Sequence, residues 1–118
     1  MSKILVVDDN AQNLYLARFL LEQGGHEVDE AYNGVEAVDA TEKVSYDLIL
    51  MDIQMPIMGG IEAARKIKRE RPFQLIVALT AKVMSGDREA ILDAGCDGVI
   101  EKPIEPTHFL ARVEAYIL

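Results

Sequence analysis

The sequence has little cysteine, no long apolar run and a shortage of basic residues. Its single cysteine, Cys96, excludes a disulfide within the chain. No apolar stretch approaches the roughly 18 residues of a membrane-spanning helix, and residues 1–3 lead into the first apolar segment without a signal peptide. We therefore expect a cytoplasmic protein with no membrane partner, in which Cys96 is a small, partly buried residue rather than a reactive thiol.

The charge balance also limits the classes of partner. The chain carries 12 Lys and Arg residues against 20 Asp and Glu residues, which gives a net charge of −8. Proteins that bind nucleic acids in general need a basic patch to neutralise phosphates, so we expect no nucleic-acid partner. An acidic excess favours solubility and cation binding, or is simply spread over the surface.

Hydrophobic residues make up 50% of the 118 residues, which is enough for a substantial core. Disordered chains have low hydrophobicity, so disorder is not expected. The length is typical of one domain. We expect residues 1–118 to form a single domain.

One stretch, Asp47–Pro56, organises the chain. Its residues 48–51 are all apolar, and the run ends at Asp52. A short apolar run of this kind is typical of a strand buried on both faces. A helix is the competing interpretation, but Pro56 and the Gly59–Gly60 pair leave no room for one. Asp52 either merely ends the strand or lies at the sheet edge where open α/β folds bind ligands.

The rest of the chain alternates between short apolar runs and helical patterns. Strands are expected at residues 4–7, 28–31, 48–51, 75–79 and 98–100. Helices are expected at residues 11–23, 35–43, 61–70, 84–94 and from about Pro106 onward. The second strand is the most polar, which favours an edge position. This alternation predicts an α/β fold: a five-stranded parallel sheet with right-handed crossovers, in a three-layer sandwich.

Helical spacing predicts which side chains face the core. In the first helix these are Leu14, Ala17 and Leu21, and in the second they are Val35 and Val38. A basic group near the end of the third helix is expected to be a solvated face: Lys66, Lys68, Arg69 and Arg71.

Reactive side chains follow four of the five predicted strands. The first strand ends at Asp8 and Asp9, the third at Asp52, the fourth at Thr80 and the fifth at Lys102. Parallel strands finish at the same edge of a sheet, so these residues should meet there. Each could be an ordinary strand terminus, but four such coincidences argue for one site. Adjacent carboxylates repel one another unless a cation joins them, and hard oxygen ligands suit Mg²⁺.

The residue types of this site are those of phosphoryl transfer. A carboxylate such as Asp52 can attack a phosphoryl group to give an aspartyl phosphate. Mg²⁺ and Lys102 would offset the phosphoryl charge, and Thr80 could donate a hydrogen bond to a phosphoryl oxygen. The two histidines, His26 and His108, are not placed for zinc and are expected to be structural or exposed.

The motifs at these strand ends resemble those of the response-regulator receiver domain of two-component signalling. The resemblance covers essentially the whole chain and rests on four motifs in order: Val7-Asp8-Asp9-Asn10, Met51-Asp52-Ile53-Gln54-Met55-Pro56, Thr80-Ala81 and Lys102-Pro103. It implies a flavodoxin-like fold with strand order 2-1-3-4-5 and five helices. It fits a stand-alone regulator or the receiver of a hybrid histidine kinase.

The resemblance also implies a role for each acidic residue. Asp52 would accept a phosphoryl group from a phosphohistidine on a histidine kinase or a histidine phosphotransfer protein. Asp9 and Asp52 would bind Mg²⁺ directly, with Mn²⁺ as an alternative. The backbone carbonyl of Gln54 would complete the direct ligands, and Asp8 would contribute through water. Phosphorylation would then switch the binding of an output protein.

The remaining roles concern the rim of the site. By resemblance, Lys102 contacts the phosphoryl group and Thr80 is the switch hydroxyl that turns toward it. The peptide bond before Pro103 is expected to be cis, a geometry that is rare without proline. The small side chain of Ala81 would leave the site open to the donor. Gly59 and Gly60 would shape the loop after the phosphorylated strand.

Three positions depart from the family pattern or vary within it. An aromatic residue three positions before the lysine often moves with the switch hydroxyl, but Val99 stands here. The output is therefore expected to rely on loop movement instead of an aromatic rotation. Gln54 and Lys82 border the phosphoryl group in the family, and we hypothesise that they tune how long the phosphate lasts.

Three other classes of function fit these residues less well. A Mg²⁺-dependent phosphohydrolase of the haloacid dehalogenase type would need a second acid where Gln54 stands, and a segment that encloses its substrate. A flavin or nucleotide carrier would need a phosphate-binding loop after the first strand, where acids stand instead. A phosphate-independent pseudo-receiver is the third alternative, although every expected site residue is present. We therefore expect a signalling domain that catalyses only its own phosphorylation and dephosphorylation.

Overall fold

The computed structural model describes residues 2–81 and 85–117. Within these ranges, five strands alternate with five helices, as the sequence predicts. The strands are β1 Lys3–Val7, β2 Glu27–Ala31, β3 Leu48–Asp52, β4 Ile76–Thr80 and β5 Gly98–Glu101. The helices are α1 Ala11–Gln23, α2 Gly34–Lys43, α3 Gly60–Glu70, α4 Ser85–Asp93 and α5 Phe109–Ile117.

The strands form one parallel sheet in the order β2-β1-β3-β4-β5, which confirms the predicted topology and the edge position of β2. The register aligns the carboxyl ends of the strands. Val7 of β1 pairs with Met51 of β3, so Asp8 and Asp52 follow side by side. Thr80 of β4 pairs with Glu101 of β5, which places Lys102 immediately beyond it. The pairing of the strands thus brings distant residues to one edge.

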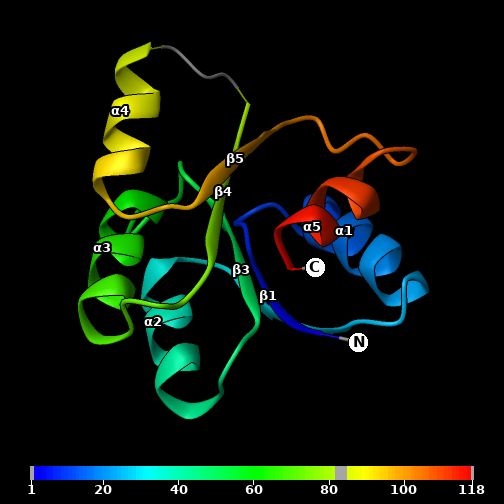
Figure 1. The fold of residues 1–118 in the computed structure, drawn as a ribbon, viewed down its shortest axis with the longest axis horizontal. Coiled ribbons are helices and arrows are strands. Elements are labelled where there is room, and N and C mark those ends of the chain that lie inside the picture. Colours follow the sequence, from blue (N-terminus) through cyan, green and yellow to red (C-terminus); the bar gives the residue numbers. More distant parts are fainter. Residues whose placement is uncertain (1, 82–84, 118) are drawn as a thin grey trace.

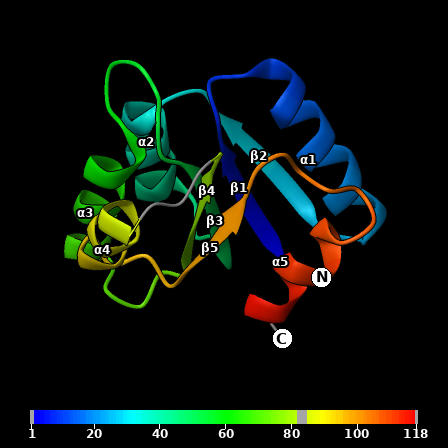
Figure 2. The same cartoon turned by 90° about the horizontal axis from the view of Figure 1, so that it is seen from above.

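Helices cover both faces of the sheet (Figures 1 and 2). The helices α2, α3 and α4 lie on one face, and α1 and α5 lie on the other. Each face has its own buried cluster, with Ile49, Met51 and Ile67 in the first and Leu48, Leu50 and Phe109 in the second. All five residues of β3 are buried, as expected for a central strand covered on both sides.

Helix α1 directs the apolar residues predicted for it into the core. Leu14, Ala17 and Leu21 are all buried. Asn10 caps the helix, because its side-chain oxygen accepts a hydrogen bond from the backbone N–H of Asn13. The helix begins at Ala11, directly after the acidic motif at the end of β1, and it ends at Gln23, with Gly24 as its C-cap.

The predicted inner face of α2 is wrong at Val35, whose side chain is 40% exposed. The buried residues of this helix are Gly34, Ala37 and Thr41, while Val38 is only partly buried. The cause is the close packing of Gly34 against Met58, whose carbonyl accepts the Gly34 N–H at 3.0 Å. This contact turns Gly34 inward, and the buried stripe follows at helical spacing from it.

The basic group of α3 is not wholly a solvated face. The Nζ atom of Lys68 lies 2.9 Å from Oδ2 of Asp97, and the Lys68 side chain is only 16% exposed. The same Asp97 oxygen accepts the backbone N–H of Ile76 at 2.9 Å. Lys68 therefore ties α3 to the start of β4, while Lys66 and Arg69 are exposed as predicted.

Helix α5 begins at Phe109, three residues later than Pro106. Residues 106–108 form a turn in which the Phe109 N–H donates to the carbonyl of Glu105 at 2.9 Å. His108 lies in this turn and is exposed. His26 is structural, because its side chain is 7% exposed and its Nε2 atom lies 2.8 Å from Glu114 of α5.

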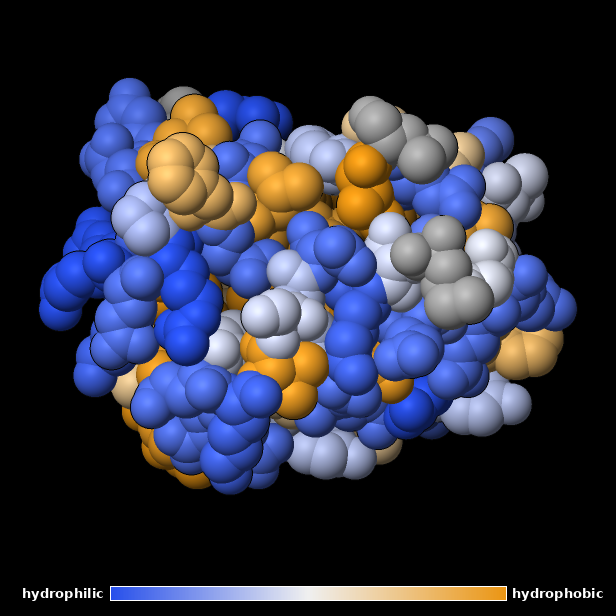
Figure 3. Space-filling model, turned by 60° about the horizontal axis from the view of Figure 1, so that its bottom comes forward, coloured by the Kyte–Doolittle hydropathy of each residue, from blue (hydrophilic) through white to orange (hydrophobic). Residues whose placement is uncertain are grey.

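The surface is predominantly hydrophilic on the face drawn in Figure 3, where hydrophobic residues appear in small separate groups. Among the described residues, no helix is both long enough and apolar enough to cross a membrane. Cys96, which the sequence predicts to be partly buried, is buried and packs in the core.

Candidate functional site

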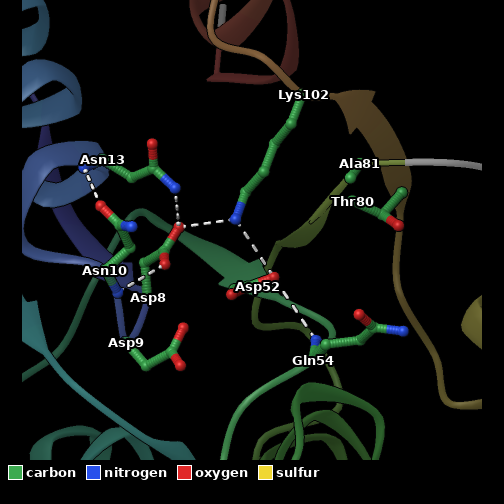
Figure 4. A pocket seen from close by; sticks show the side chains of 9 residues that line it. All are labelled: Asp8, Asp9, Asn10, Asn13, Asp52, Gln54, Thr80, Ala81 and Lys102. Carbon is green, nitrogen blue, oxygen red and sulfur yellow. Dashed lines mark hydrogen bonds and ion pairs between the residues drawn. The ribbon is translucent and has the colours of Figure 1, made fainter.

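A polar pocket of about 430 Å³ lies at the carboxyl edge of the sheet (Figure 4). It is lined by residues from the ends of β1, β3, β4 and β5 and from the start of α1: Asp8, Asp9, Asn10, Asn13, Asp52, Gln54, Thr80, Ala81 and Lys102. The four strand ends that the sequence analysis singled out therefore meet in one cavity.

Lys102 reaches down into this pocket between two carboxylates (Figure 4). Its Nζ atom lies 2.8 Å from Oδ2 of Asp8 and 3.3 Å from Oδ1 of Asp52. The backbone of Lys102 is fixed as well, since its N–H donates to the Thr80 carbonyl at 2.7 Å. The peptide bond between Lys102 and Pro103 is cis. One ammonium group thus bridges the ends of β1 and β3.

The carboxylates outnumber this cation. Oxygen atoms of Asp8, Asp9 and Asp52 all lie within 4.8 Å of one another. Asp8 and Asp52 are buried, with 1% and 6% of their surface exposed, whereas Asp9 is exposed. Burial, and next the charge of Asp8, raise the pKa of Asp52 to about 6 even though Lys102 lowers it. The site therefore carries an excess of negative charge that a bound cation would relieve.

The pKa of the Lys102 ammonium is shifted by burial and by the same buried carboxylates. Burial lowers its pKa, but hydrogen bonds and charge interactions with Asp8 and Asp52 raise it more, so the pKa lies above the usual 10.5. Lys102 is therefore cationic at physiological pH and available to an incoming anion.

Asp8 is held by two asparagines that the sequence analysis did not single out as site residues. The backbone N–H of Asn10 donates to its Oδ1 atom at 2.9 Å, and the side-chain amide of Asn13 donates to its Oδ2 atom at 3.3 Å. Asn13 lies in the first turn of α1, five residues after Asp8. The signal in the sequence was an amide at that spacing, just inside the helix that follows the acidic pair.

The other predicted site residues lie around the rim. Thr80 is buried at the end of β4 and Ala81 follows it, both on the side of the pocket away from Asp9 (Figure 4). Gln54 is exposed, and its backbone N–H lies 3.4 Å from Oδ1 of Asp52. Val99 lies in β5 and packs partly buried against the core. Lys82 lies outside the described residues.

The loop between β3 and α3 is anchored at both ends. The Ile53 N–H donates to the Leu79 carbonyl at 3.2 Å, and the Gly60 N–H donates to the Ile53 carbonyl at 3.1 Å. Between them, Ile57 has a φ of 72° and an 82% exposed side chain. A β-branched residue in this left-handed region costs on the order of 1–2 kcal/mol. Strain is thus stored in the loop that follows Asp52.

The donor set fits a hard divalent cation. The three clustered acids offer carboxylate oxygens, which Mg²⁺ prefers together with retained waters. Among the described residues that line the pocket, there is no histidine or cysteine that would favour zinc. The open, exposed position of Asp9 leaves space beside it for water ligands.

The arrangement can carry out nucleophilic chemistry on a phosphoryl group. Oδ1 of the Asp52 carboxylate contacts the Lys102 ammonium and the Gln54 N–H. Lys102 supplies a positive charge within reach of a phosphoryl group on that carboxylate. These residues can position a phosphoryl group and neutralise its negative charge, which is most of what phosphoryl transfer requires.

Comparisons with known proteins agree with this reading of the site. Residues 4–114 match the family model described as the response regulator receiver domain. The polar-differentiation response regulator DivK of Brucella anthropi is 38% identical over 116 residues, which are 97% of this chain and 94% of that protein.

Solved structures show the same fold. The chemotaxis protein CheY4 of Vibrio cholerae superimposes with a TM-score of 0.93 at 28% identity, over 100% of this chain and 99% of that one. The receiver domain of the sensor histidine kinase PA1611 from Pseudomonas aeruginosa superimposes with a TM-score of 0.89 at 33% identity, over 98% of this chain and 97% of that one. That structure holds a magnesium ion in its active-site cleft. With its acidic pocket of Asp8, Asp9 and Asp52, the chain belongs to the response regulator receiver domains, which are phosphorylatable signalling proteins rather than catalytic enzymes.

Proposed function

We propose that residues 1–118 form one cytoplasmic receiver domain in which Asp52 accepts a phosphoryl group from a phosphohistidine. The donor is a histidine kinase or a histidine phosphotransfer protein. The observation that carries this proposal is the position of Asp52: a buried carboxylate beside two further acids and one bridging ammonium. A purely structural strand terminus would not need such a cluster, because unpaired buried charge costs stability.

The transfer forms one bond and breaks another. An oxygen of Asp52 attacks the phosphorus atom, and the P–N bond to the imidazole breaks with its electron pair left on the nitrogen. The imidazole ring takes up one proton from solvent, so the products are an aspartyl phosphate on the protein and a free histidine on the donor. Hydrolysis later returns the carboxylate and releases inorganic phosphate.

The acids of the pocket would hold a divalent cation beside Asp52. Asp9 and Asp52 would hold Mg²⁺ directly together with the backbone carbonyl of Gln54, and Asp8 would contribute through water. When bound, the ion neutralises charge on the phosphoryl oxygens. Mn²⁺ has the same preference for oxygen ligands and can take its place.

The residues at the ends of β4 and β5 change their contacts when Asp52 is phosphorylated. Lys102 moves its contact from Asp52 to the phosphoryl group, and the hydroxyl of Thr80 turns toward it. Ala81 leaves room for the donor. Because Val99 offers no aromatic ring to rotate, the change reaches the output surface through movement of the neighbouring loops. The phosphorylated domain then binds an output protein differently.

Gln54 and Lys82 tune the lifetime of the aspartyl phosphate. Gln54 supports this through its place on the pocket rim, where its side chain can order or exclude the attacking water. Substitution of each residue by alanine should change the dephosphorylation rate. Unchanged lifetimes in both variants would end this part of the proposal.

Transfer from a phosphorylated histidine phosphotransfer protein tests the whole proposal. We expect label to pass from donor to the wild-type chain with Mg²⁺, and not with EDTA. Asp52→Asn should accept no label, whereas Asp39→Asn, which removes an exposed acid of α2, should accept it normally. Transfer to Asp52→Asn, or no transfer to the wild type from any phosphohistidine donor, would contradict the proposal. The second result would favour a phosphate-independent interaction domain.

A further inference from the structure

We propose that Asn13 is a positioning residue that keeps Asp8 hydrogen-bonded when Lys102 moves to the phosphoryl group. This inference rests on the proposed function, since it concerns the same rearrangement of Lys102. It assigns a role to an amide in the first turn of α1, beside the acidic cluster.

The contacts of Asp8 show why a replacement donor is needed. Its Oδ2 atom receives two donors, the Lys102 ammonium at 2.8 Å and the Asn13 amide at 3.3 Å. Its Oδ1 atom receives the backbone N–H of Asn10 at 2.9 Å. Figure 4 shows the Asn13 amide and Lys102 approaching the same end of the Asp8 carboxylate. The shorter contact belongs to Lys102, so Asn13 is the secondary donor in this state.

Departure of Lys102 would be costly without Asn13. Asp8 is only 1% exposed, so bulk water has little access to its carboxylate. A metal-bound water can supply one donor to Asp8 in the proposed site, but it does not replace the donor that Lys102 takes away, and a buried carboxylate oxygen that loses a donor is not compensated by bulk solvent. With Asn13 present, Oδ2 keeps one donor throughout, and the 3.3 Å contact can shorten toward the usual 2.9 Å of such bonds.

The amide of Asn13 is held in place for this task. Its backbone N–H donates to the side-chain oxygen of Asn10 at 3.0 Å, at the start of α1. Asn10 in turn donates its own N–H to Asp8, and Asn13 closes the ring through its side chain. This closed ring fixes both oxygens of Asp8 relative to α1. Replacement of the Asn13 side chain removes one donor and leaves the backbone cap of the helix intact.

Beryllofluoride, a phosphoryl analogue, separates the movement of Lys102 from binding of the metal. We would measure the Kd for Mg²⁺ alone and the Kd for beryllofluoride at saturating Mg²⁺, on the full chain. Asn13→Leu should weaken beryllofluoride binding about 10-fold, because the buried Oδ2 atom of Asp8 loses its remaining side-chain donor when Lys102 moves away. Its affinity for Mg²⁺ alone should stay close to that of the wild type, because Lys102 still holds Asp8 in that state.

Two further variants control the result. Gln12→Leu changes the exposed neighbouring residue of α1 and should leave both constants unchanged. Asn13→Gln keeps an amide donor and should recover most of the beryllofluoride affinity. Circular dichroism and urea unfolding establish that each variant is folded before binding is measured.

The outcomes distinguish this inference from the function on which it rests. Equal beryllofluoride affinity in Asn13→Leu and wild type would overturn the inference and leave the proposed function standing. A parallel loss of Mg²⁺ affinity would also overturn it, since Asn13 would then only orient Asp8 for the metal. Failure of the wild type itself to bind beryllofluoride would contradict the proposed function and this inference with it.

Discussion

Gly60 packs directly against the backbone of Asp52. A Cβ atom at Gly60 would collide with the carbonyl oxygen of Asp52, and it would also crowd the Cα atom of Ile53. The neighbours here are backbone atoms, which cannot move aside as the end of a flexible side chain can. The start of α3 can therefore lie this close to the end of β3 only because residue 60 has no side chain.

We predict that Gly60→Ala lowers the free energy of unfolding by about 1–3 kcal/mol, the usual cost of overpacking. It should also weaken Mg²⁺ binding, because the collision displaces the backbone that carries the Asp52 carboxylate. Urea unfolding and a Mg²⁺ titration measure the two effects.

Gly59→Ala is the matched control for this prediction. A Cβ atom at Gly59 would lie 3.4 Å from the Ile53 carbonyl oxygen, near ordinary contact distance. We expect a much smaller loss of stability. Equal effects of the two substitutions would show that the close contact at Asp52 is not what makes Gly60 necessary.

Asp52→Asn should stabilise the metal-free protein. Burial, and next Asp8, raise the pKa of Asp52 from its ordinary 3.8 to about 6, so the ionised carboxylate opposes folding at pH 7. The unfolded chain releases this proton at lower pH than the folded chain. The contribution of Asp52 to stability therefore falls as pH rises from about 4 to about 6 and stays low above that range. The substitution should raise the free energy of unfolding at pH 7 by about 1–3 kcal/mol.

Urea unfolding with EDTA, from pH 4 to pH 7, tests this expectation. Between about pH 4 and about pH 6, the free energy of unfolding of the wild type should decline relative to that of Asp52→Asn. Asp39→Asn removes the charge of an exposed acid in α2 and should change stability little. A variant Asp52→Asn that is less stable than the wild type at pH 7 would show that the acidic cluster carries no net repulsion.

Cys96 should react slowly with thiol reagents. Burial, followed by the charge of Asp97, raises the pKa of its thiol from 9.0 to about 11. At pH 8 this leaves about 100-fold fewer thiolates than an ordinary cysteine would have, and only 5% of the residue is exposed. Labelling by iodoacetamide should therefore accelerate with pH up to about 11 and become fast on unfolding in urea. Rapid labelling of the folded protein at pH 8 would contradict the burial of this thiol.

The sequence predicts the fold and the cluster of strand-end residues for one physical reason. Four of the five strands are short apolar runs that end at a reactive side chain, and parallel strands share one carboxyl edge. Local pattern is sufficient there, because Asp8, Asp52 and Thr80 follow directly from strands buried on both faces.

Features that depend on contacts between distant residues could not be predicted in this way. The exposure of Val35 follows from the packing of Gly34 against Met58, and the burial of Lys68 follows from its pairing with Asp97. Neither partner lies within one helical turn. The role of Asn13 could not be predicted, because an amide side chain on a helix is usually solvated. Its contact with Asp8 depends on the conformation of the turn before α1, which the sequence pattern does not specify.

The site of covalent modification is the first property to measure. The protein is incubated with acetyl phosphate and Mg²⁺, followed by intact mass measurement and peptide mapping, with Asp52→Asn and an EDTA sample alongside. We predict one labile phosphoryl group on Asp52, absent from both controls. A phosphoryl group on another residue, or one that persists in Asp52→Asn, would show that Asp52 is not the phosphoacceptor.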